Sequence, residues 1–348
     1  MLTTETINKT NQTNQMNLPE LLLQMSNGTF VTQTIYVAAK LGIADLLKDG
    51  AKSSDELAKL TDVDAQSLYR LLRALSSHGI FAEGENRQFQ LTPLGECLQT
   101  DIPGSMRDFA IILGEPWFWQ VCGSLLHSVK TGKNAFENVF GMEPFAYLAQ
   151  HPERAQILSE AINAFTSSII PALLASYDLS AIGKIVDVSG GQGTFIAEIL
   201  KANPTMKGIL FDQPPVAQGA RRYIEAQGVA ERCEIMGGNF CEFVPSGGDA
   251  YILKQILHTC NDESALTILK NCHQVMNENS KLIIFEAVIP PANKRSLSKW
   301  FDLHMLLMGE GQERTETEYQ ELLAAAGFMV NKVIFTQAPI DVIEAVKI

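Results

Sequence analysis

Hydrophobic positions along the chain follow two different periods. Up to about residue 180 they recur every three or four residues, the spacing that places side chains on one face of a helix. From Ile182 onwards, short runs of consecutive apolar residues alternate with helical patterns. The change of period predicts a helical front part followed by an α/β part.

The front part, residues 18–100, has the pattern of a winged helix. Its apolar positions predict a helix pair broken at Gly42, and Ser53 with Glu56 has the spacing of a capping box before the next helix. Asp64 stands where the N-cap of a further helix belongs. Two short apolar runs then flank a polar turn and predict a β-hairpin, Ile80–Ala82 and Phe89–Leu91.

The segments on either side of this part carry weaker patterns. Residues 1–17 are polar and lack the apolar stretch of a signal peptide, which favours a flexible tail. Residues 101–180 are predicted to form mostly helices that link the domains and line a substrate pocket. Trp117, Phe118 and Trp119 cluster there, either as core residues or as a ligand wall.

Residues 181–348 predict a mainly parallel sheet with helices on both faces, because strands and helices alternate. The expected strands are Ile185–Val188, Gly208–Phe211, Cys233–Met236, Ala250–Leu253 and Leu282–Ile289. The expected helices are Thr194–Ala202, Val216–Gln227, Asp262–Val275 and Thr317–Ala326. Lys332–Thr336 and Val342–Val346 predict a hairpin at the edge of the sheet.

The charge of the chain argues against nucleic acid as a partner. Lys and Arg number 27 against 39 Asp and Glu, a formal net charge of −12. Residues 18–100 alone hold 7 basic and 10 acidic residues, a net of 7 − 10 = −3. A winged helix that binds DNA normally presents a basic face. The pattern therefore favours a structural or dimerising module.

The cysteines and the apolar runs indicate a cytoplasmic protein without a membrane partner. The six cysteines form no CxxC pair and no Cys/His metal spacing, as expected for reduced thiols. The sequence contains no uninterrupted apolar run near the roughly 18 residues of a membrane span.

A glycine-rich loop follows the first predicted strand of the α/β part, in the sequence Val186-Asp-Val-Ser-Gly-Gly-Gln-Gly-Thr194. Such a loop, at the carboxyl edge of a parallel sheet, suits a nucleotide-like ligand. Ile196 replaces the third glycine of a dinucleotide fingerprint, and no Gly-Lys-Ser/Thr sequence supports a phosphate loop. A ligand without phosphate fits better, and S-adenosylmethionine is the leading candidate.

Asp212 supports this interpretation. It ends the second strand, 212 − 193 = 19 residues after the loop, where a carboxylate can accept hydrogen bonds from both ribose hydroxyls. The alternative is a helix N-cap, since Pro214 and Pro215 follow directly.

From about Leu22 to Val346 the chain resembles the two-domain, class-I S-adenosylmethionine-dependent O-methyltransferases. This family includes caffeic-acid, acetylserotonin, and bacterial polyketide and phenazine O-methyltransferases. The resemblance rests on six motifs in order: VDVSGGQG, FDQP, GGNF, LKQILH, FEAVIP and DLHMLLMGEGQERT. It implies a Rossmann-like catalytic domain, a front domain that forms a homodimer, and a small hydroxylated aromatic substrate.

The resemblance also implies cofactor contacts at matching positions. These are the loop residues Ser189, Gly191 and Gly193, then Asp212 for the ribose, Asn239 and Phe240 for the adenine, Lys254, and Tyr147 on a weak local motif. Ser189 replaces the usual first glycine, and Asn239 replaces an aspartate.

His258 stands where the family keeps its catalytic base, with Glu286 and Glu313 at the positions of two flanking carboxylates. Taken singly, the histidine could neighbour a helix cap, Glu286 could be a solvated strand end, and Glu313 could pair with Arg314. A neutral imidazole can take the proton of a phenol, and a carboxylate can fix its tautomer. His304 could line the substrate pocket.

Thr259-Cys260 replaces the Asp-Trp pair that usually follows the histidine, which leaves the substrate open. With a base at His258 and no other ligand-spaced cluster, no metal is expected. The alternatives are non-methylating chemistry on the same cofactor, a winged-helix regulator, or a nicotinamide dehydrogenase.

Overall fold

A computed structural model describes residues 17–348, and these form two compact units. The N-terminal unit contains residues 17–102 and 106–115, and the C-terminal unit contains residues 103–105 and 116–348. The predicted tail, apart from its last residue, lies outside the described residues.

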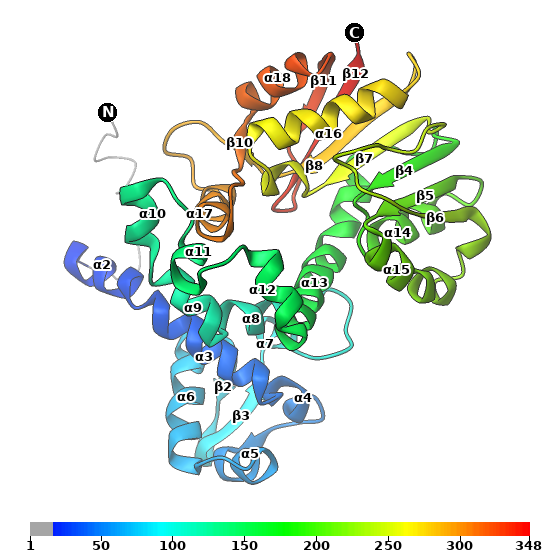
Figure 1. Cartoon of the computed structure of the whole chain (residues 1–348). Helices are drawn as coiled ribbons and strands as arrows, with labels where there is room; N and C mark the ends of the chain where they lie inside the picture. The colour runs from blue at the N-terminus through cyan, green and yellow to red at the C-terminus, as the bar shows by residue number, and fades with distance from the viewer. Residues whose placement is uncertain (1–16) are drawn as a thin grey trace. The chain divides into compact units, whose positions relative to one another are not determined.

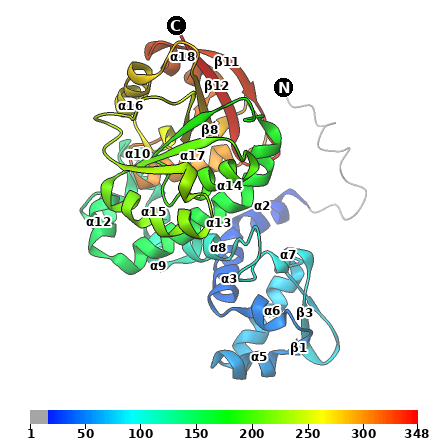
Figure 2. The same ribbon diagram turned by 90° about the vertical axis from the view of Figure 1, so that its right-hand side faces the viewer.

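The N-terminal unit is built from helices and a small sheet (Figure 2). The helix break predicted at Gly42 is confirmed, because Gly42 adopts a left-handed conformation with φ 65°. The Ser53–Glu56 capping box and the Asp64 N-cap both form as expected. The helices are α2 (Leu18–Ser26), α3 (Gly28–Lys40), α4 (Ile43–Leu47), α5 (Ser54–Thr61), α6 (Ala65–Ser77), α7 (Pro93–Glu96) and α8 (Arg107–Gly114).

The predicted hairpin of this unit is also confirmed. Strands β2 (Phe81–Glu83) and β3 (Gln88–Leu91) pair antiparallel around the short helix η1 (Glu85–Arg87), and β1 (Lys52–Ser53) adds a third strand beside β3. The apolar faces of α3 to α6 and the hairpin enclose one core, which includes Leu57, Leu72 and Phe89.

The C-terminal unit begins with five helices. They are α9 (Pro116–Cys122), α10 (Leu125–Thr131), α11 (Ala135–Phe140), α12 (Pro144–Gln150) and α13 (Pro152–Ser176). These helices therefore belong to the same compact unit as the sheet, whereas α8 groups with the N-terminal unit.

The centre of this unit is a seven-stranded sheet in the order β11-β12-β8-β7-β4-β5-β6. Six strands run in one direction and β12 runs antiparallel to them between β8 and β11, so the expected mainly parallel α/β sheet with an edge hairpin is confirmed. The strands are β4 (Lys184–Val188), β5 (Lys207–Asp212), β6 (Cys233–Gly237), β7 (Ala250–Lys254), β8 (Lys281–Glu286), β11 (Phe328–Ile334) and β12 (Asp341–Lys347).

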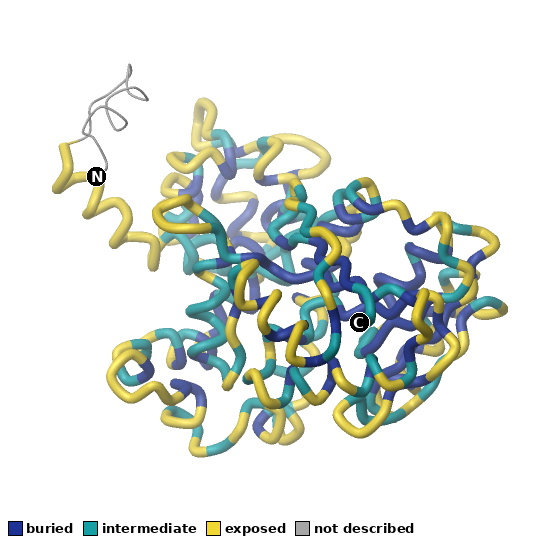
Figure 3. The backbone as a smooth tube through the Cα atoms, turned by 90° about the horizontal axis from the view of Figure 1, so that it is seen from above, coloured by how far each residue is buried: buried dark blue, intermediate teal, exposed yellow. Residues whose placement is uncertain are grey.

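Helices cover both faces of the sheet, with α14 and α15 on one face and α16 and α18 on the other (Figure 1). Burial is concentrated in the strands, which appear dark blue in Figure 3. The helices and short turns of this region are α14 (Thr194–Ala202), α15 (Pro214–Ala226), η2 (Ala230–Arg232), η3 (Leu257–Thr259), α16 (Asp262–Val275), α17 (Ser298–Met308) and α18 (Glu316–Ala325).

The prediction of one continuous strand over Leu282–Ile289 is wrong. The chain leaves the large sheet after Glu286, and β9 (Val288–Ile289) pairs instead with β10 (Arg314–Thr315) in a separate two-stranded sheet. The break has a physical cause, because the Glu286 carboxylate accepts backbone hydrogen bonds from the turn after β7. An apolar run cannot reveal such an interruption.

Helix α13 is the one described single helix whose length and composition would allow it to cross a membrane. Six of its residues are nevertheless buried in the unit. Three polar side chains of α13 also bind residues at the carboxyl edge of the sheet: Ser159, Asn163 and Thr166. These contacts are those of a core helix.

Candidate active site

The predicted site residues gather at the carboxyl edge of the sheet, around β4 and β7. Strand β4 lies between β5 and β7, so the chain reverses its winding direction there. Crevices at such reversal points are the usual ligand sites of open α/β sheets. The glycine loop follows β4, and η3 with His258 follows β7.

The glycine loop is fixed by backbone contacts to β5. Ser189 adopts φ 62° although it is not glycine, and its N–H donates to the Phe211 carbonyl at 2.7 Å. This conformation explains why a glycine usually stands at that position. Gly193 is required for two reasons, since its φ is 85° and a Cβ there would lie 2.6 Å from the Leu210 side chain.

Asp212 binds the glycine loop and does not cap the following helix. One carboxylate oxygen accepts from the Gly191 N–H at 2.8 Å, and the other accepts from the adjacent Gln213 N–H at 2.6 Å. Helix α15 has no side-chain cap hydrogen bond, so the N-cap alternative is not the geometry observed. Burial raises the pKa of Asp212, while hydrogen bonds from Gly191, Gln213 and the Ser189 side chain oppose that shift.

Asp187 is a site residue that the sequence interpretation missed. It lies within β4, 2% exposed, and its Oδ2 is buried without a hydrogen-bond partner among the described residues. Burial raises its pKa to about 7, with Lys254 opposing that shift. A lone acidic residue inside an apolar strand was the available signal, because such a charge is rarely buried without a function.

Lys254, at the end of β7, lies between the strand that precedes the glycine loop and the carboxylates around His258. Its ammonium donates to Thr166 of α13 at 3.1 Å. Burial lowers the pKa of Lys254, and the negative charges of Asp187 and Glu286 oppose that shift. The side chain therefore lies within electrostatic range of Asp187 in β4, before the glycine loop, and of Glu286 at the end of β8.

Asn239 and Phe240 lie in the segment after β6. The Gln213 side chain, next to Asp212, donates to the Asn239 side-chain oxygen at 3.4 Å, and Asn271 of α16 donates to the Phe240 carbonyl at 2.9 Å. The Asn239 side-chain oxygen accepts from the Cys241 N–H at 3.0 Å, and its amide donates to Glu242 at 3.0 Å. Phe240 is partly buried against the core of the sheet. Their predicted role at the adenine stays a prediction.

Tyr147 is buried in an aromatic cluster of the helical region. Its ring lies 5.2 Å from that of Phe136, 4.5 Å from that of Phe140 and 4.3 Å from that of His151. Each of these contacts is a packing contact, and an approach to the cofactor likewise stays a prediction.

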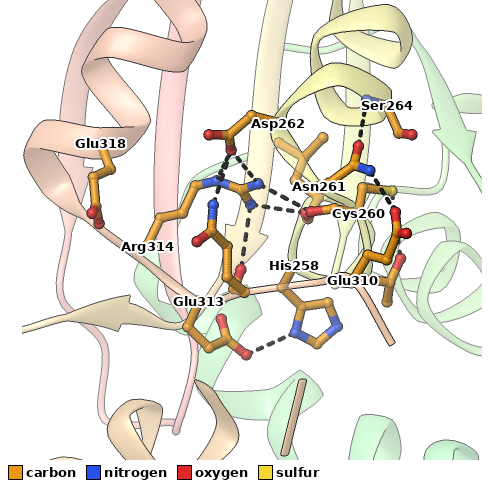
Figure 4. Close-up of polar contacts among 12 residues, drawn as sticks. His258, Cys260, Asn261, Asp262, Ser264, Glu310, Glu313, Arg314 and Glu318 are labelled. Atoms are coloured by element: carbon orange, nitrogen blue, oxygen red, sulfur yellow. Dashed lines mark hydrogen bonds and ion pairs between the residues drawn. The ribbon is translucent and has the colours of Figure 1, made fainter. Parts of the chain in front are cut away.

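His258, Glu286 and Glu313 do come together, as expected. Nδ1 of His258 lies 2.7 Å from Oε1 of Glu313 and 3.8 Å from Oε2 of Glu286 (Figure 4 shows the first contact). The Glu286 and Glu313 side chains are 0% and 1% exposed, and the imidazole is 11% exposed. Since Nδ1 faces the carboxylates, Nε2 is the ring nitrogen left for a substrate.

The two carboxylates hold different parts of His258. Glu313 binds the ring, whereas Oε1 of Glu286 accepts from the backbone N–H groups of Ile256 and Leu257 at 2.8 Å. Glu286 thus caps the short helix η3 and fixes the histidine backbone. The alternatives of a solvated Glu286 and a Glu313–Arg314 pair are both wrong, because Arg314 pairs with Asp262 at 2.7 Å.

Arg314 holds the opposite side of the same turn. Its buried guanidinium donates to the Leu257 carbonyl at 2.9 Å and to the Cys260 carbonyl at 3.1 Å (Figure 4). Gly311 packs directly against the backbone of this turn, because a Cβ at Gly311 would lie 2.1 Å from the His258 carbonyl oxygen. Backbone contacts therefore locate the histidine from both sides.

The charges around His258 favour its protonated form. Burial alone would lower the pKa of the imidazole, but the negative charges of Glu286 and Glu313 outweigh burial and raise it. Burial raises the pKa of Glu286 to about 7. His258 and the two carboxylates beside it can therefore share a proton near neutral pH.

His304 and Asp302 bring helix α17 to this site. Asp302 accepts from the Glu313 N–H at 3.0 Å and so positions the segment that carries the carboxylate. His304 packs edge-on against Phe118 of α9, with ring centroids 4.9 Å apart. Sequence reasoning did not single out Asp302, whose contact depends on tertiary structure.

Among the described residues, His258, Glu286 and Glu313 form the one cluster with the spacing of metal ligands. Three of its atoms are already engaged, by the His258–Glu313 hydrogen bond and the backbone contacts of Glu286. The expectation of no metal stays a prediction.

Comparisons with known proteins assign this arrangement to a family. The O-methyltransferase domain profile matches residues 123–329, and the O-methyltransferase dimerisation domain profile matches residues 23–101. The chain belongs to the O-methyltransferase family. It is 42% identical to a phenazine O-methyltransferase of Lysobacter antibioticus, over 96% of this chain and 98% of that protein.

Two further O-methyltransferase-family proteins show the range of this similarity. A phenazine-1-carboxylate N-methyltransferase of Pseudomonas aeruginosa is 31% identical over 90% of this chain and 92% of its own. The crystal structure of the calicheamicin methyltransferase CalO1 with bound S-adenosylhomocysteine has a TM-score of 0.87 and 30% identity, covering 96% of this chain and all of that one.

The family resemblance deduced from the sequence is thereby confirmed, and the protein is an S-adenosylmethionine-dependent methyltransferase. The residues present fit this cofactor. Gly191 has open space where a side chain would stand, and the nearby Asp187 carries a buried carboxylate oxygen without a protein partner. The family assignment therefore argues against a nicotinamide dehydrogenase and against a winged-helix regulator.

The contact between Glu313 and the imidazole predicts an effect on the pKa of His258. We expect Glu313→Gln to lower this pKa, because the substitution removes a negative charge 2.7 Å from Nδ1. Titration of histidine-labelled protein by NMR measures the pKa, and the chain has only six histidines. Glu316→Gln, an exposed change at the start of α18, is the control. An unchanged His258 pKa in Glu313→Gln would contradict the assignment.

Proposed function

We propose that the protein transfers a methyl group from S-adenosylmethionine to a hydroxyl of a small aromatic metabolite, with His258 as general base. The observation that carries this proposal is the hydrogen bond between Nδ1 of His258 and buried Glu313. A histidine bound in this way keeps Nε2 free to accept a proton, as in a catalytic triad.

The base is needed because of the nucleophile. A phenol has a pKa of about 10 and is mostly protonated at neutral pH, so it attacks poorly until its proton leaves. In our proposal, Nε2 of His258 takes that proton while Glu313 and Glu286 stabilise the imidazolium. When bound, the cofactor supplies an electrophilic methyl group on a positively charged sulfur.

The same argument favours oxygen over nitrogen as the acceptor. A neutral amine already carries a lone pair and needs no base before it attacks. In this protein, two buried carboxylates, those of Glu286 and Glu313, and the buried Arg314 position the imidazole of His258. The Lysobacter relative is named a phenazine O-methyltransferase, and we therefore propose a hydroxylated heteroaromatic compound as the class of acceptor.

Cofactor binding is assigned to the residues around the glycine loop. Gly191 and Gly193 would hold the methionine portion and Asp212 the ribose. Lys254 would contact the cofactor near the end of β7. The loop from Ser189 to Gly193 would approach the cofactor through its backbone. Asn239, Phe240 and Tyr147 complete the proposed set.

The N-terminal unit would form the homodimer. Helix α2 has no buried residue, and it is yellow along its length beside the N label in Figure 3. Leu18, Leu22 and Phe30 are 73%, 65% and 70% exposed, an apolar surface that a monomer rarely leaves open. Because the dimerisation domain profile covers these helices from residue 23, a second copy of this chain is the proposed partner.

The proposed partners and cellular location follow from the charge of the chain, the contacts of α13 and the state of the cysteines. The acidic N-terminal unit suits a partner protein better than nucleic acid, and the contacts of α13 suit a core helix better than a membrane span. A cytoplasmic location is the proposed one, since all six cysteines are free.

Removal of the base should separate turnover from cofactor binding. We expect His258→Ala to reduce methyl transfer by roughly 10²- to 10⁴-fold, because the phenol keeps its proton. S-adenosylmethionine affinity should change less than about twofold by calorimetry, since the imidazole is assigned to the substrate. Methyl-labelled cofactor with a panel of phenols and hydroxyphenazines measures the transfer.

The controls for this experiment are a second histidine variant and the pH profile. His78→Ala changes an exposed histidine of the N-terminal unit and should keep full activity. Because the pKa of His258 is raised and the neutral form is active, the wild-type rate should increase as pH rises through that pKa. Full activity of His258→Ala would exclude the histidine as the base.

Asp212 should contribute directly to cofactor affinity. We expect Asp212→Ala to weaken S-adenosylmethionine binding by roughly 10- to 100-fold, the effect of losing charged hydrogen bonds. Asp212→Asn keeps an oxygen for the Gly191 N–H and should therefore bind the cofactor better than Asp212→Ala. Equal dissociation constants for the wild type and Asp212→Ala would restrict Asp212 to a structural role.

The apolar surface of α2 and α3 should hold the dimer together. Leu22→Asp with Phe30→Asp should give a particle with the mass of one chain, because two charges would be buried at the interface. Light scattering after gel filtration measures the mass. Leu60→Asp, on the exposed side of α5, is the control. A variant that remains dimeric would place the interface elsewhere.

A further inference from the structure

Helix α17 presents a set of half-buried side chains next to the base. All residues from 301 to 306 are intermediate in exposure, neither fully buried nor fully exposed. Phe301, His304, Met305 and Met308 follow the i, i+3, i+4, i+7 spacing of one helix face.

Aromatic rings from two other helices meet this face. Phe301 packs edge-on against Phe165 of α13 at 6.0 Å, and His304 packs edge-on against Phe118 of α9 at 4.9 Å. Phe165 and Phe118 are themselves buried. His304 carries the polar ring of this group, and its contact with Phe118 fixes the orientation of the imidazole.

The imidazole of His304 is neutral and has hydrogen-bonding capacity left over. Burial and the positive charge of His258 lower its pKa to about 4, so it carries one N–H donor and one acceptor nitrogen at neutral pH. No described residue forms a hydrogen bond with either nitrogen, and the residue keeps partial solvent access. Its ring nitrogens are not among the fully buried polar atoms, so water can reach them. A bound ligand that displaces this water must offer a hydrogen-bond partner in its place or leave the ring unpaired.

We propose that His304 determines substrate specificity, by forming a hydrogen bond to a second heteroatom of the aromatic substrate beside the hydroxyl that is methylated. This inference rests on the proposed function, since it places the substrate between His258 and α17. It names the substrate class more closely: heteroaromatic or dihydroxylated rings are preferred over plain phenols of the same shape. A site with a buried hydrogen-bonding group rejects analogues that leave it unpaired.

The test compares two probes of the same shape, 1-hydroxyphenazine and 1-hydroxyanthracene, which differ only in the ring nitrogens. Their dissociation constants are measured on protein saturated with S-adenosylhomocysteine, so that no methyl transfer is needed. We expect His304→Phe to reduce the preference for 1-hydroxyphenazine by about tenfold through loss of one hydrogen bond. His304→Gln, which retains a donor and an acceptor, should keep part of the preference.

The matched control is Trp300→Ala, a change at a 67% exposed position of the same helix, which should leave the preference intact. An unchanged preference in His304→Phe, an equal loss in Trp300→Ala, or binding of neither probe by the wild type would overturn the inference. The proposed function fails in a different way, when 1-hydroxyphenazine binds but receives no labelled methyl group from S-adenosylmethionine.

Discussion

The active site depends on the cost of placing ionisable groups at low dielectric. Asp187, Lys254, His258, Glu286 and Glu313 all lie at the carboxyl edge of the sheet. Burial shifts the first two and Glu286 towards their neutral forms, whereas at His258 the neighbouring carboxylates outweigh burial and raise the pKa of the imidazole. Each charge is tolerable only beside its partner. Lys254 interacts with both Asp187 and Glu286, so the cofactor loop and the base belong to one electrostatic system.

Backbone contacts fix the position of His258, and this explains how unusual residues beside it are accommodated. Glu286 binds the amides before His258, Arg314 binds the carbonyls around it, and Gly311 packs against its carbonyl oxygen. The side chains of Thr259 and Cys260 instead bond to the Ile256 carbonyl. None of the backbone contacts that fix His258 uses these two side chains, so residues other than Asp-Trp at these positions leave those contacts in place.

Helices α13 and α17 connect this chemistry to recognition. Helix α13 binds the glycine loop through Ser159 and Lys254 through Thr166, so its position is coupled to the cofactor side. Helix α17 holds Glu313 through Asp302, and its His304 lies close enough to His258 for the charge of His258 to lower the pKa of His304. In the proposed function, the elements that fix His258 therefore also carry the side chains that would meet the acceptor.

The sequence by itself determined most helices, the hairpins and the parallel strands, because periodicity and caps are local signals. Its resemblance to a known family also named His258, Glu286 and Glu313 as neighbours, which the structure brings together. Ser53, Asp64 and Gly42 act as predicted for that reason. The end of β8 at Glu286, the burial of Asp187, and the contacts of Asp302 and Arg314 were decided only by tertiary structure. Each of these depends on groups far apart in the chain that meet at one sheet edge, where the need to satisfy buried charges and amides overrides the local hydrophobic pattern.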